Sequence, residues 1–149
     1  MHAFVPRMIA SGEPGHVVNT ASTAGVVAFP GIASYDVAKQ GVVALSEVLL
    51  ADAMAEKLPI RVSVLCPGVV RTKIGVSERN RPGGVKGDAF GEEGLITATE
   101  AIEPEAVAQA VLRAINDGTF WIMTHPRYVD LVKKPIWDKG QKLLSATSR

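Results

Sequence analysis

The sequence predicts an α/β fold in which three parallel strands are flanked by helices. Three short apolar segments, 16–21, 60–66 and 119–124, have the length of strands. The connections between them contain helical patterns over 34–57 and from Glu103 onward. A strand, a helix and a further strand in this order favour a right-handed crossover, and therefore a parallel sheet.

Length and composition indicate one globular domain. The chain has 149 residues, of which 47% are hydrophobic and 21% charged. The net charge of +1, without a basic run, gives no reason to expect nucleic acid or a membrane surface as a partner. The most apolar stretch, 41–55, is interrupted by polar and charged residues, so we expect no membrane span. The single cysteine, Cys66, fits a reducing compartment, and we expect a cytoplasmic protein.

The first elements are a short helix and a strand. Residues 3–11 predict the tail of a helix, in which Pro6 is acceptable only if little helix precedes it. The glycines and proline of 11–15 predict a turn. The pair Val17-Val18 suits a buried position in a parallel sheet. We expect a segment of a longer domain, because the helix begins almost at Met1.

The long helix predicted after the loop 22–32 runs from Ser34, which we expect to be its N-cap, to about Lys57. It is apolar around most of its circumference and therefore needs cover on two sides. We expect the sheet on one side and a second subunit on the other. The polar residues of its first half are expected in one sector of the helix: Asp36, Lys39, Gln40, Ser46 and Glu47.

The rest of the chain predicts a long loop, a helix and a strand. Five glycines lie between Gly83 and Gly94, within a loop of a length usually found in lids and binding loops. The next helix has a proline in its first turn and Gly118 as its C-cap, with an apolar stripe at Val107, Val111 and Ile115. A helical tail is expected over 126–149.

Tyr35 and Lys39 are the first candidates for chemistry. They are spaced i, i+4 and lie on one face of the predicted helix. An ammonium group beside the hydroxyl favours phenolate, which lowers the tyrosine pKa from its ordinary value of about 10. Such a tyrosine can exchange a proton near neutral pH. Ser22, at the end of the first strand, can donate a hydrogen bond to a reacting oxygen. This chemistry suits the interconversion of a carbonyl and an alcohol.

These residues resemble the pattern of the short-chain dehydrogenase/reductase family, in which Tyr-x-x-x-Lys follows a serine by thirteen positions. The same resemblance is carried by the remaining motif residues, in their order along the chain: Gly15-His16-Val17-Val18-Asn19, Ala24-Gly25 and Pro67-Gly68-x-x-x-Thr72. The family implies part of a Rossmann-like, doubly wound parallel sheet and an oxidoreductase that uses NAD or NADP. Its catalytic residues would be Ser22, Tyr35 and Lys39.

The resemblance also implies a cofactor site and a substrate. Lys39 and Tyr35 would contact the cofactor, and Pro67 and Gly68 would run beneath it. The Val70 backbone would meet the nicotinamide carboxamide, and the Thr72 hydroxyl the carboxamide or the diphosphate. The substrate would be a small carbonyl or alcohol compound, and the segment 73–101 would close its cleft. Members of the family commonly pair through the helix expected here at Ser34–Lys57.

One part of the family pattern is missing from this sequence. No Gly-x-x-x-Gly-x-Gly or Gly-x-Gly-x-x-Gly loop follows an opening strand, so the pyrophosphate loop of a dinucleotide site is not present. We therefore expect 1–149 to be a single partial domain, the C-terminal half of the family domain. The alternative is a truncated, non-catalytic fragment that acts as an interaction or dimerisation module. His2, His16 and His125 show no metal spacing, and we expect none to be a ligand.

Overall fold

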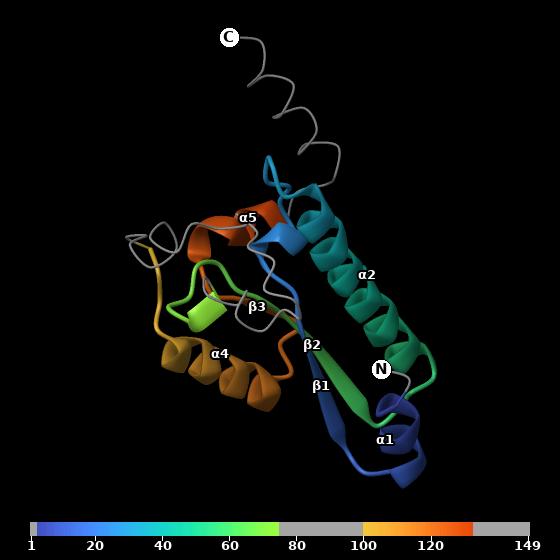
Figure 1. Cartoon of the computed structure of the whole chain (residues 1–149). Coiled ribbons are helices and arrows are strands. Elements are labelled where there is room, and N and C mark those ends of the chain that lie inside the picture. Colours follow the sequence, from blue (N-terminus) through green and yellow to red (C-terminus); the bar gives the residue numbers. More distant parts are fainter. Residues whose placement is uncertain (1–2, 75–99, 133–149) are drawn as a thin grey trace, which may run out of the picture.

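The sheet has three parallel strands in the order β1-β2-β3, as predicted (Figure 1). A computed structural model of the chain describes residues 3–74 and 100–132. Its elements are α1 (Val5–Ser11), β1 (Gly15–Thr20), the 3-10 turn η1 (Thr23–Gly25), α2 (Ala33–Ala55), β2 (Ile60–Cys66), α4 (Pro104–Asp117), β3 (Trp121–Met123), the 3-10 turn η3 (Pro126–Tyr128) and α5 (Val129–Val132).

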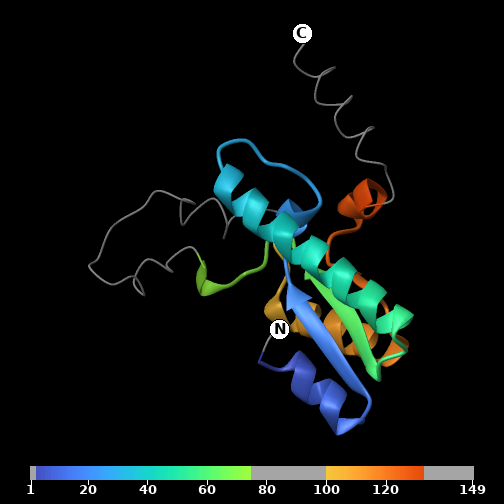
Figure 2. The same cartoon turned by 90° about the vertical axis from the view of Figure 1, so that its right-hand side faces the viewer.

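Helices cover both faces of the sheet, with α2 on one side and α4 on the other (Figures 1 and 2). β2 is the central strand, and every residue in it except Arg61 is buried. β1 pairs with β2 over six residues and is an edge strand, so most of its side chains are only half-buried. The prediction of a buried position for Val17-Val18 is therefore met only in part.

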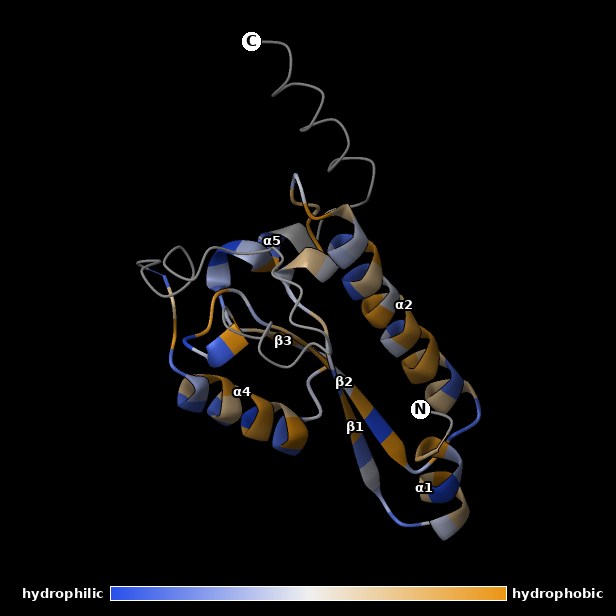
Figure 3. Ribbon diagram, viewed as in Figure 1, coloured by the Kyte–Doolittle hydropathy of each residue, from blue (hydrophilic) through white to orange (hydrophobic). Residues whose placement is uncertain are grey.

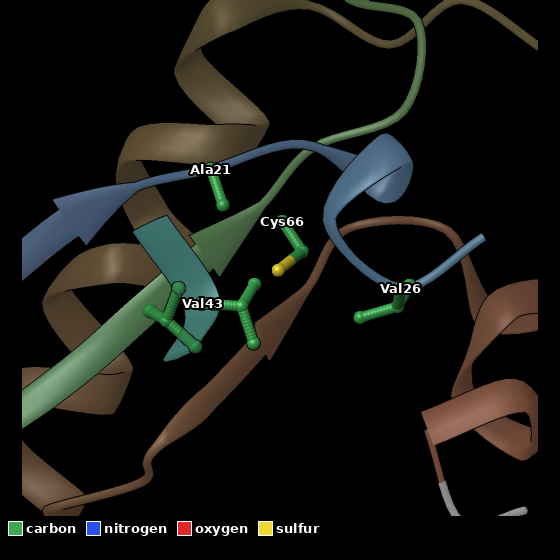
Figure 4. Close-up of a cluster of buried hydrophobic side chains, with 5 residues drawn as sticks. Ala21, Val26, Val43 and Cys66 are labelled. Carbon is green, nitrogen blue, oxygen red and sulfur yellow. The ribbon is translucent and has the colours of Figure 1, made fainter. Parts of the chain in front are cut away.

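The main core lies between the sheet, α2 and the loop after β1 (Figure 4). It consists of Ala21, Val26, Val43, Val64 and Cys66. Cys66 is fully buried at the end of β2, as expected for a small residue there. Leu65, Ala114 and Ile122 form a second cluster on the α4 face. The two clusters pack against opposite faces of β2.

The helix ends follow the local sequence. α1 begins at Val5, which places Pro6 in the first turn, where a proline is tolerated. α4 starts at Pro104, and its C-cap is Gly118, whose φ of 71° is left-handed. Val107 and Val111 of the predicted stripe are half-buried and pack with the buried Ala114, whereas Ile115 is half-buried outside this cluster.

One prediction for α2 is wrong: the N-cap is Ile32, and Ser34 is an exposed residue of the first turn. The polar residues do share one sector of the helix, as their spacing predicts, but two of them, Asp36 and Ser46, are buried. The Asp36 carboxylate turns back onto the preceding loop and accepts the Phe29 N–H at 2.8 Å. A local pattern does not reveal this contact, since the loop supplies the donor.

Ser46 is buried because it links α2 to the sheet. Its hydroxyl donates to the Val42 carbonyl at 2.7 Å and accepts the Asn19 amide at 3.0 Å. Asn19 therefore links β1 to α2.

Several predictions fall on parts of the chain outside the described residues. These are most of the predicted lid at 73–101 and, in the predicted tail at 126–149, everything after α5. Among the helices in the described ranges, 3–74 and 100–132, we find none long and apolar enough to cross a membrane.

Candidate active site

The carboxyl ends of the three strands meet at one edge of the sheet, where ligands bind in open α/β sheets. The contacts between the strands continue past their ends. The Ala21 N–H donates to the Leu65 carbonyl at 2.8 Å, and the Thr23 N–H donates to the Pro67 carbonyl at 2.9 Å. Two predicted site segments, around Ser22 and around Pro67, are therefore held side by side.

Ser22 is half-buried at the start of η1, directly beyond β1. Its hydroxyl oxygen accepts the Ala24 N–H at 3.2 Å, which caps the 3-10 turn. This bond uses the oxygen as an acceptor, so the hydroxyl can still donate its proton. The side chain can therefore cap the turn and donate to a ligand at the same time.

Tyr35 and Lys39 lie one turn apart in the first half of α2. The Lys39 ammonium is 5.6 Å from the centre of the Tyr35 ring. The same ammonium donates to the carbonyl of Thr20, the last residue of β1, at 3.3 Å. Lys39 thus joins the tyrosine to the sheet edge, two residues from Ser22.

Gly25 allows the serine and the helix to approach each other. A Cβ atom at this position would lie 2.7 Å from the Val43 Cγ2 atom and 3.0 Å from the Lys39 carbonyl oxygen. Contacts this short have no room for a side chain. The Ala24-Gly25 motif therefore brings η1 directly against α2.

Cys66 lies beneath this group. Burial raises the pKa of its thiol to about 11, although the Ser22 backbone N–H and the positive charge of Lys39 act in the opposite direction. The thiol is therefore protonated at neutral pH and is not a nucleophile. Its role here is to fill space under the loop that carries Ser22.

The segment after β2 lies beside the residues that follow position 99. Val70 forms an isolated parallel bridge with Ile102: the Arg71 N–H donates to Ile102, and the Ile102 N–H donates to Val69. In an extended chain the N–H and C=O of alternate residues point to opposite sides. The Val70 N–H and C=O are therefore directed away from Ile102. The Thr72 hydroxyl is exposed and accepts the Ile74 N–H at 3.4 Å.

The prediction missed His125, which lies directly after β3 and is buried against Gly68. The family resemblance predicts that Gly68 runs beneath the cofactor. In the structure, the atoms that a Cβ on Gly68 would meet belong to the His125 ring, the nearest at 2.5 Å. The one signal for this in the sequence is that His125, like Ser22 and Pro67, follows a strand.

Two surface hollows lie away from these residues. One, of about 520 Å³, lies between the last turns of α2 and the start of β2, with Met54, Leu58 and Phe120 in its lining. The other, of about 230 Å³, lies between α4 and β3, with Arg113 and Trp121 in its lining. Neither contains a predicted site residue. In the described part of the chain, no group of three or more His, Cys, Asp or Glu residues could hold a metal ion.

The family model for short-chain dehydrogenases matches residues 1–83, which is more than half of the chain and contains the serine, tyrosine and lysine. The chain belongs to the short-chain dehydrogenase family. This confirms the resemblance inferred from the motifs. It also agrees with the observed sheet, which is the fold of the solved family members described below.

Dehydrogenases from bacteria are among the curated relatives of this chain. The CLA biosynthesis dehydrogenase/reductase of Lactiplantibacillus plantarum is 31% identical over 147 residues, covering 89% of this chain and 50% of the relative. The 1-deoxy-11-beta-hydroxypentalenate dehydrogenase of Streptomyces avermitilis is 39% identical over 126 residues, covering 83% and 40%. The chain thus spans about half the length, or less, of the curated relatives it matches.

Solved structures show the same architecture. A short-chain dehydrogenase/reductase of Burkholderia phymatum, determined in complex with NAD, superposes with a TM-score of 0.77 at 30% identity, covering 89% of this chain and 50% of the other. A short-chain dehydrogenase of Sphingobium yanoikuyae, determined with NADPH, superposes with a TM-score of 0.67 at 24% identity, covering 97% and 50%. At this lower identity the second likeness shows the fold alone.

Proposed function

We propose that this chain carries the catalytic residues of an NAD(P)-dependent oxidoreductase that interconverts a small carbonyl compound and an alcohol. One observation carries the proposal. Lys39 lies beside Tyr35 and bonds the Thr20 carbonyl at the sheet edge, where Ser22 begins the next turn. Three side chains with the right chemistry therefore belong to one corner of the fold.

Each of these residues has one task in the proposed reaction. A bound nicotinamide supplies or accepts the hydride. Ser22 donates a hydrogen bond to the substrate oxygen and steadies the charge that develops there. Tyr35 gives a proton to that oxygen during reduction and takes one during oxidation. The positive charge of Lys39 stabilises Tyr35 when it has given up its proton.

The proposed cofactor contacts are Tyr35, Lys39, Pro67, Gly68, Val70 and Thr72. The orientation of Val70 supports a contact with the nicotinamide carboxamide, because its N–H and C=O point away from Ile102 and can form hydrogen bonds with that group. The exposed Thr72 hydroxyl is open to a polar group. The proposed role of Gly68 is indirect. Its N–H donates to Thr124 and His125, so it fixes the conformation of the segment and does not itself donate to the cofactor.

We further propose that the chain corresponds to the C-terminal half of the family domain. Its coverage of about half of each relative supports this, and so does the position of β1 as a half-buried edge strand. In the Rossmann order 3-2-1-4-5-6, the cofactor lies where the strand order reverses. The strands on the far side of that point would contribute the glycine-rich loop. We also propose that the protein is cytoplasmic, because its single cysteine, Cys66, fits a reducing compartment.

The test uses a fusion of this chain behind the first half of the Burkholderia phymatum relative. We expect Tyr35→Phe to lower kcat by at least about 100-fold, because general acid–base catalysis contributes about 10² to 10⁴. The Kd for NADH, followed by nicotinamide fluorescence, should change less than threefold. Tyr128→Phe is the matched control and should keep the activity. A Tyr35→Phe fusion that turns over at the wild-type rate would disprove the catalytic assignment.

A second candidate function is that of a dimerisation module, with a second copy of this chain as the partner. α2 exposes Val37, Leu45 and Val48, which recur at helical spacing on one face. Figure 3 shows that hydrophobic residues occur along much of α2. Leu45→Glu should shift the chain to monomer in light scattering, while Leu112→Glu, at an equally exposed leucine on α4, should not. A wild-type chain that is monomeric throughout the concentration series would reject this function.

A further inference from the structure

The buried imidazole of His125 contacts two segments that are distant in the sequence, at Gly68 and Glu100, and the hydroxyl of its neighbour Thr124. The Gly68 N–H, after β2, lies 3.2 Å from Nδ1. The Thr124 hydroxyl, at the end of β3, lies 2.8 Å from the same nitrogen. The Glu100 carbonyl lies 3.0 Å from Nε2. The side chain is 6% exposed, so these contacts are shielded from water.

The backbone partners decide which nitrogen carries the proton. The Gly68 N–H can only donate, so its contact with Nδ1 needs the Nδ1 lone pair. The Glu100 carbonyl can only accept, so its contact with Nε2 needs a proton on Nε2. The Gly68 N–H also reaches the Thr124 hydroxyl oxygen at 3.2 Å.

The shape of the contact is as restrictive as its hydrogen bonds. A Cβ on Gly68 would lie 2.5, 2.7 and 2.8 Å from three atoms of the His125 ring. The imidazole thus fills the space that any other residue at position 68 would need. Two ion pairs close by, Arg71–Glu103 and Arg127–Glu100, are exposed at both partners, and such pairs contribute little. The buried ring therefore holds this segment together with two backbone attachments, from Thr23 to Pro67 and between Val70 and Ile102.

We propose that His125 is a positioning residue for the cofactor site: it holds the Pro67-Gly68 turn so that the following Val70 backbone faces the nicotinamide. The proposal rests on the proposed function. Gly68 is two residues before Val70, and the Ile102 bridge fixes the other side of Val70. The Ile102 bridge directs the Val70 N–H and C=O away from Ile102, and His125 holds the chain two residues earlier, at Gly68.

A positioning role and a packing role require different properties of the side chain at position 125. If His125 only filled space, an apolar ring of similar size would serve equally well. If it positions the turn, the acceptor at Nδ1 is required. Asparagine places its Oδ1 near the position of Nδ1 and can accept the Gly68 N–H, whereas phenylalanine keeps the ring and loses the acceptor. Thr124 remains in both variants, so the comparison isolates the imidazole acceptor.

The experiment measures hydrogen exchange at the Gly68 amide in the 149-residue chain by NMR. We expect His125→Phe to speed exchange of this amide at least fivefold, because one of its two acceptors is gone. His125→Asn should restore protection to within about twofold of wild type. The amides of Val62 and Val64 in β2 report on the fold and should not change. His16→Phe, at the other described histidine, is the matched control and should leave Gly68 unaffected.

Equal Gly68 protection in wild type, His125→Phe and His125→Asn would overturn the positioning role and leave only packing. The cofactor part is decided in the fusion described above. The Kd for NADH should rise at least fivefold in His125→Phe and less than twofold in His125→Asn. An unchanged Kd with faster Gly68 exchange would overturn the link to the cofactor. A wild-type fusion that binds no NADH would reject the proposed function instead, while the exchange result would still decide what His125 does to the turn.

Discussion

Gly25→Ala is the substitution that most directly tests how the site is assembled. The added methyl would lie 2.7 Å from Val43 Cγ2 and 3.0 Å from the Lys39 carbonyl oxygen. Carbon atoms in contact normally lie about 3.5 to 4.0 Å apart, so η1 and α2 must separate by roughly 1 Å. Val43 is buried in the main core, and the carbonyl belongs to the helix backbone. Neither can move without its surroundings.

The expected cost follows from this geometry. An extra methyl in a well-packed core lowers the free energy of unfolding by about 1 to 3 kcal/mol. The backbone of Gly25 is not left-handed, so strain in φ adds nothing. The same displacement would move Tyr35 and Lys39 away from Ser22. A misplacement of about 1 Å at a reacting centre costs roughly 100-fold in rate, which the fusion enzyme would reveal.

The assay is urea unfolding of the chain, with two comparisons. Gly41→Ala adds a methyl to α2 where nothing lies within 4 Å, and should raise stability by about 0.5 to 1 kcal/mol. In a Val43→Ala background the closest clash is gone, so Gly25→Ala should cost at least about 1 kcal/mol less than in wild type. If Gly25→Ala costs the same in both backgrounds, or nothing, the close approach of η1 to α2 is not what the glycine provides.

Two further predictions concern the pH dependence of stability. Burial raises the pKa of the Cys66 thiol to about 11 in the folded chain, so the associated contribution to stability, about 2 to 3 kcal/mol, is present below about pH 9 and is lost as the pH rises toward 11. In urea unfolding, Cys66→Ala should lack this loss of stability at high pH. An equal loss in both proteins would contradict the assignment to Cys66. Burial, with the charge of Arg61 second, lowers the His16 pKa from its ordinary value, so stability is present above about pH 6.5 and falls as the pH drops through the lowered pKa. Between pH 7 and 5, the unfolding temperature should decrease less in His16→Gln, which retains a partner for Ser63, than in the wild type. An equal decrease in both proteins would show that His16 does not cause this pH dependence of stability.

Elements with a strong local signal could be predicted from the sequence. β2 has the predicted bounds, since an apolar run ends there at Pro67-Gly68. α4 begins at the predicted Pro104 and is capped by Gly118, because each residue acts on its own backbone. The motif of Ser22, Tyr35 and Lys39 could also be read, because its spacing is local. Their separate roles in catalysis stay predictions.

Contacts between distant segments could not be read in this way. The Asp36 carboxylate is buried because a loop supplies its donor, and its position in the polar sector of the helix does not reveal that contact. The meeting of His125 with Gly68 joins positions 57 residues apart. The sequence around either residue does not predict the contact, because a glycine after a strand can serve several structural purposes. The register of β2 and β3 brings the two residues together.

The order of the strands along the sheet, the same as their order along the chain, has a consequence for folding. Each pairing joins strands that are consecutive in the sequence, so the sheet can grow in one direction as the chain is made. β1 and β2 share six paired positions, whereas β2 and β3 share three. We expect the β2–β3 ladder to be the last to form and the first to open. The contact between His125 and Gly68 lies just beyond the β2–β3 ladder, so we expect this contact to be lost when the three pairs of that ladder open.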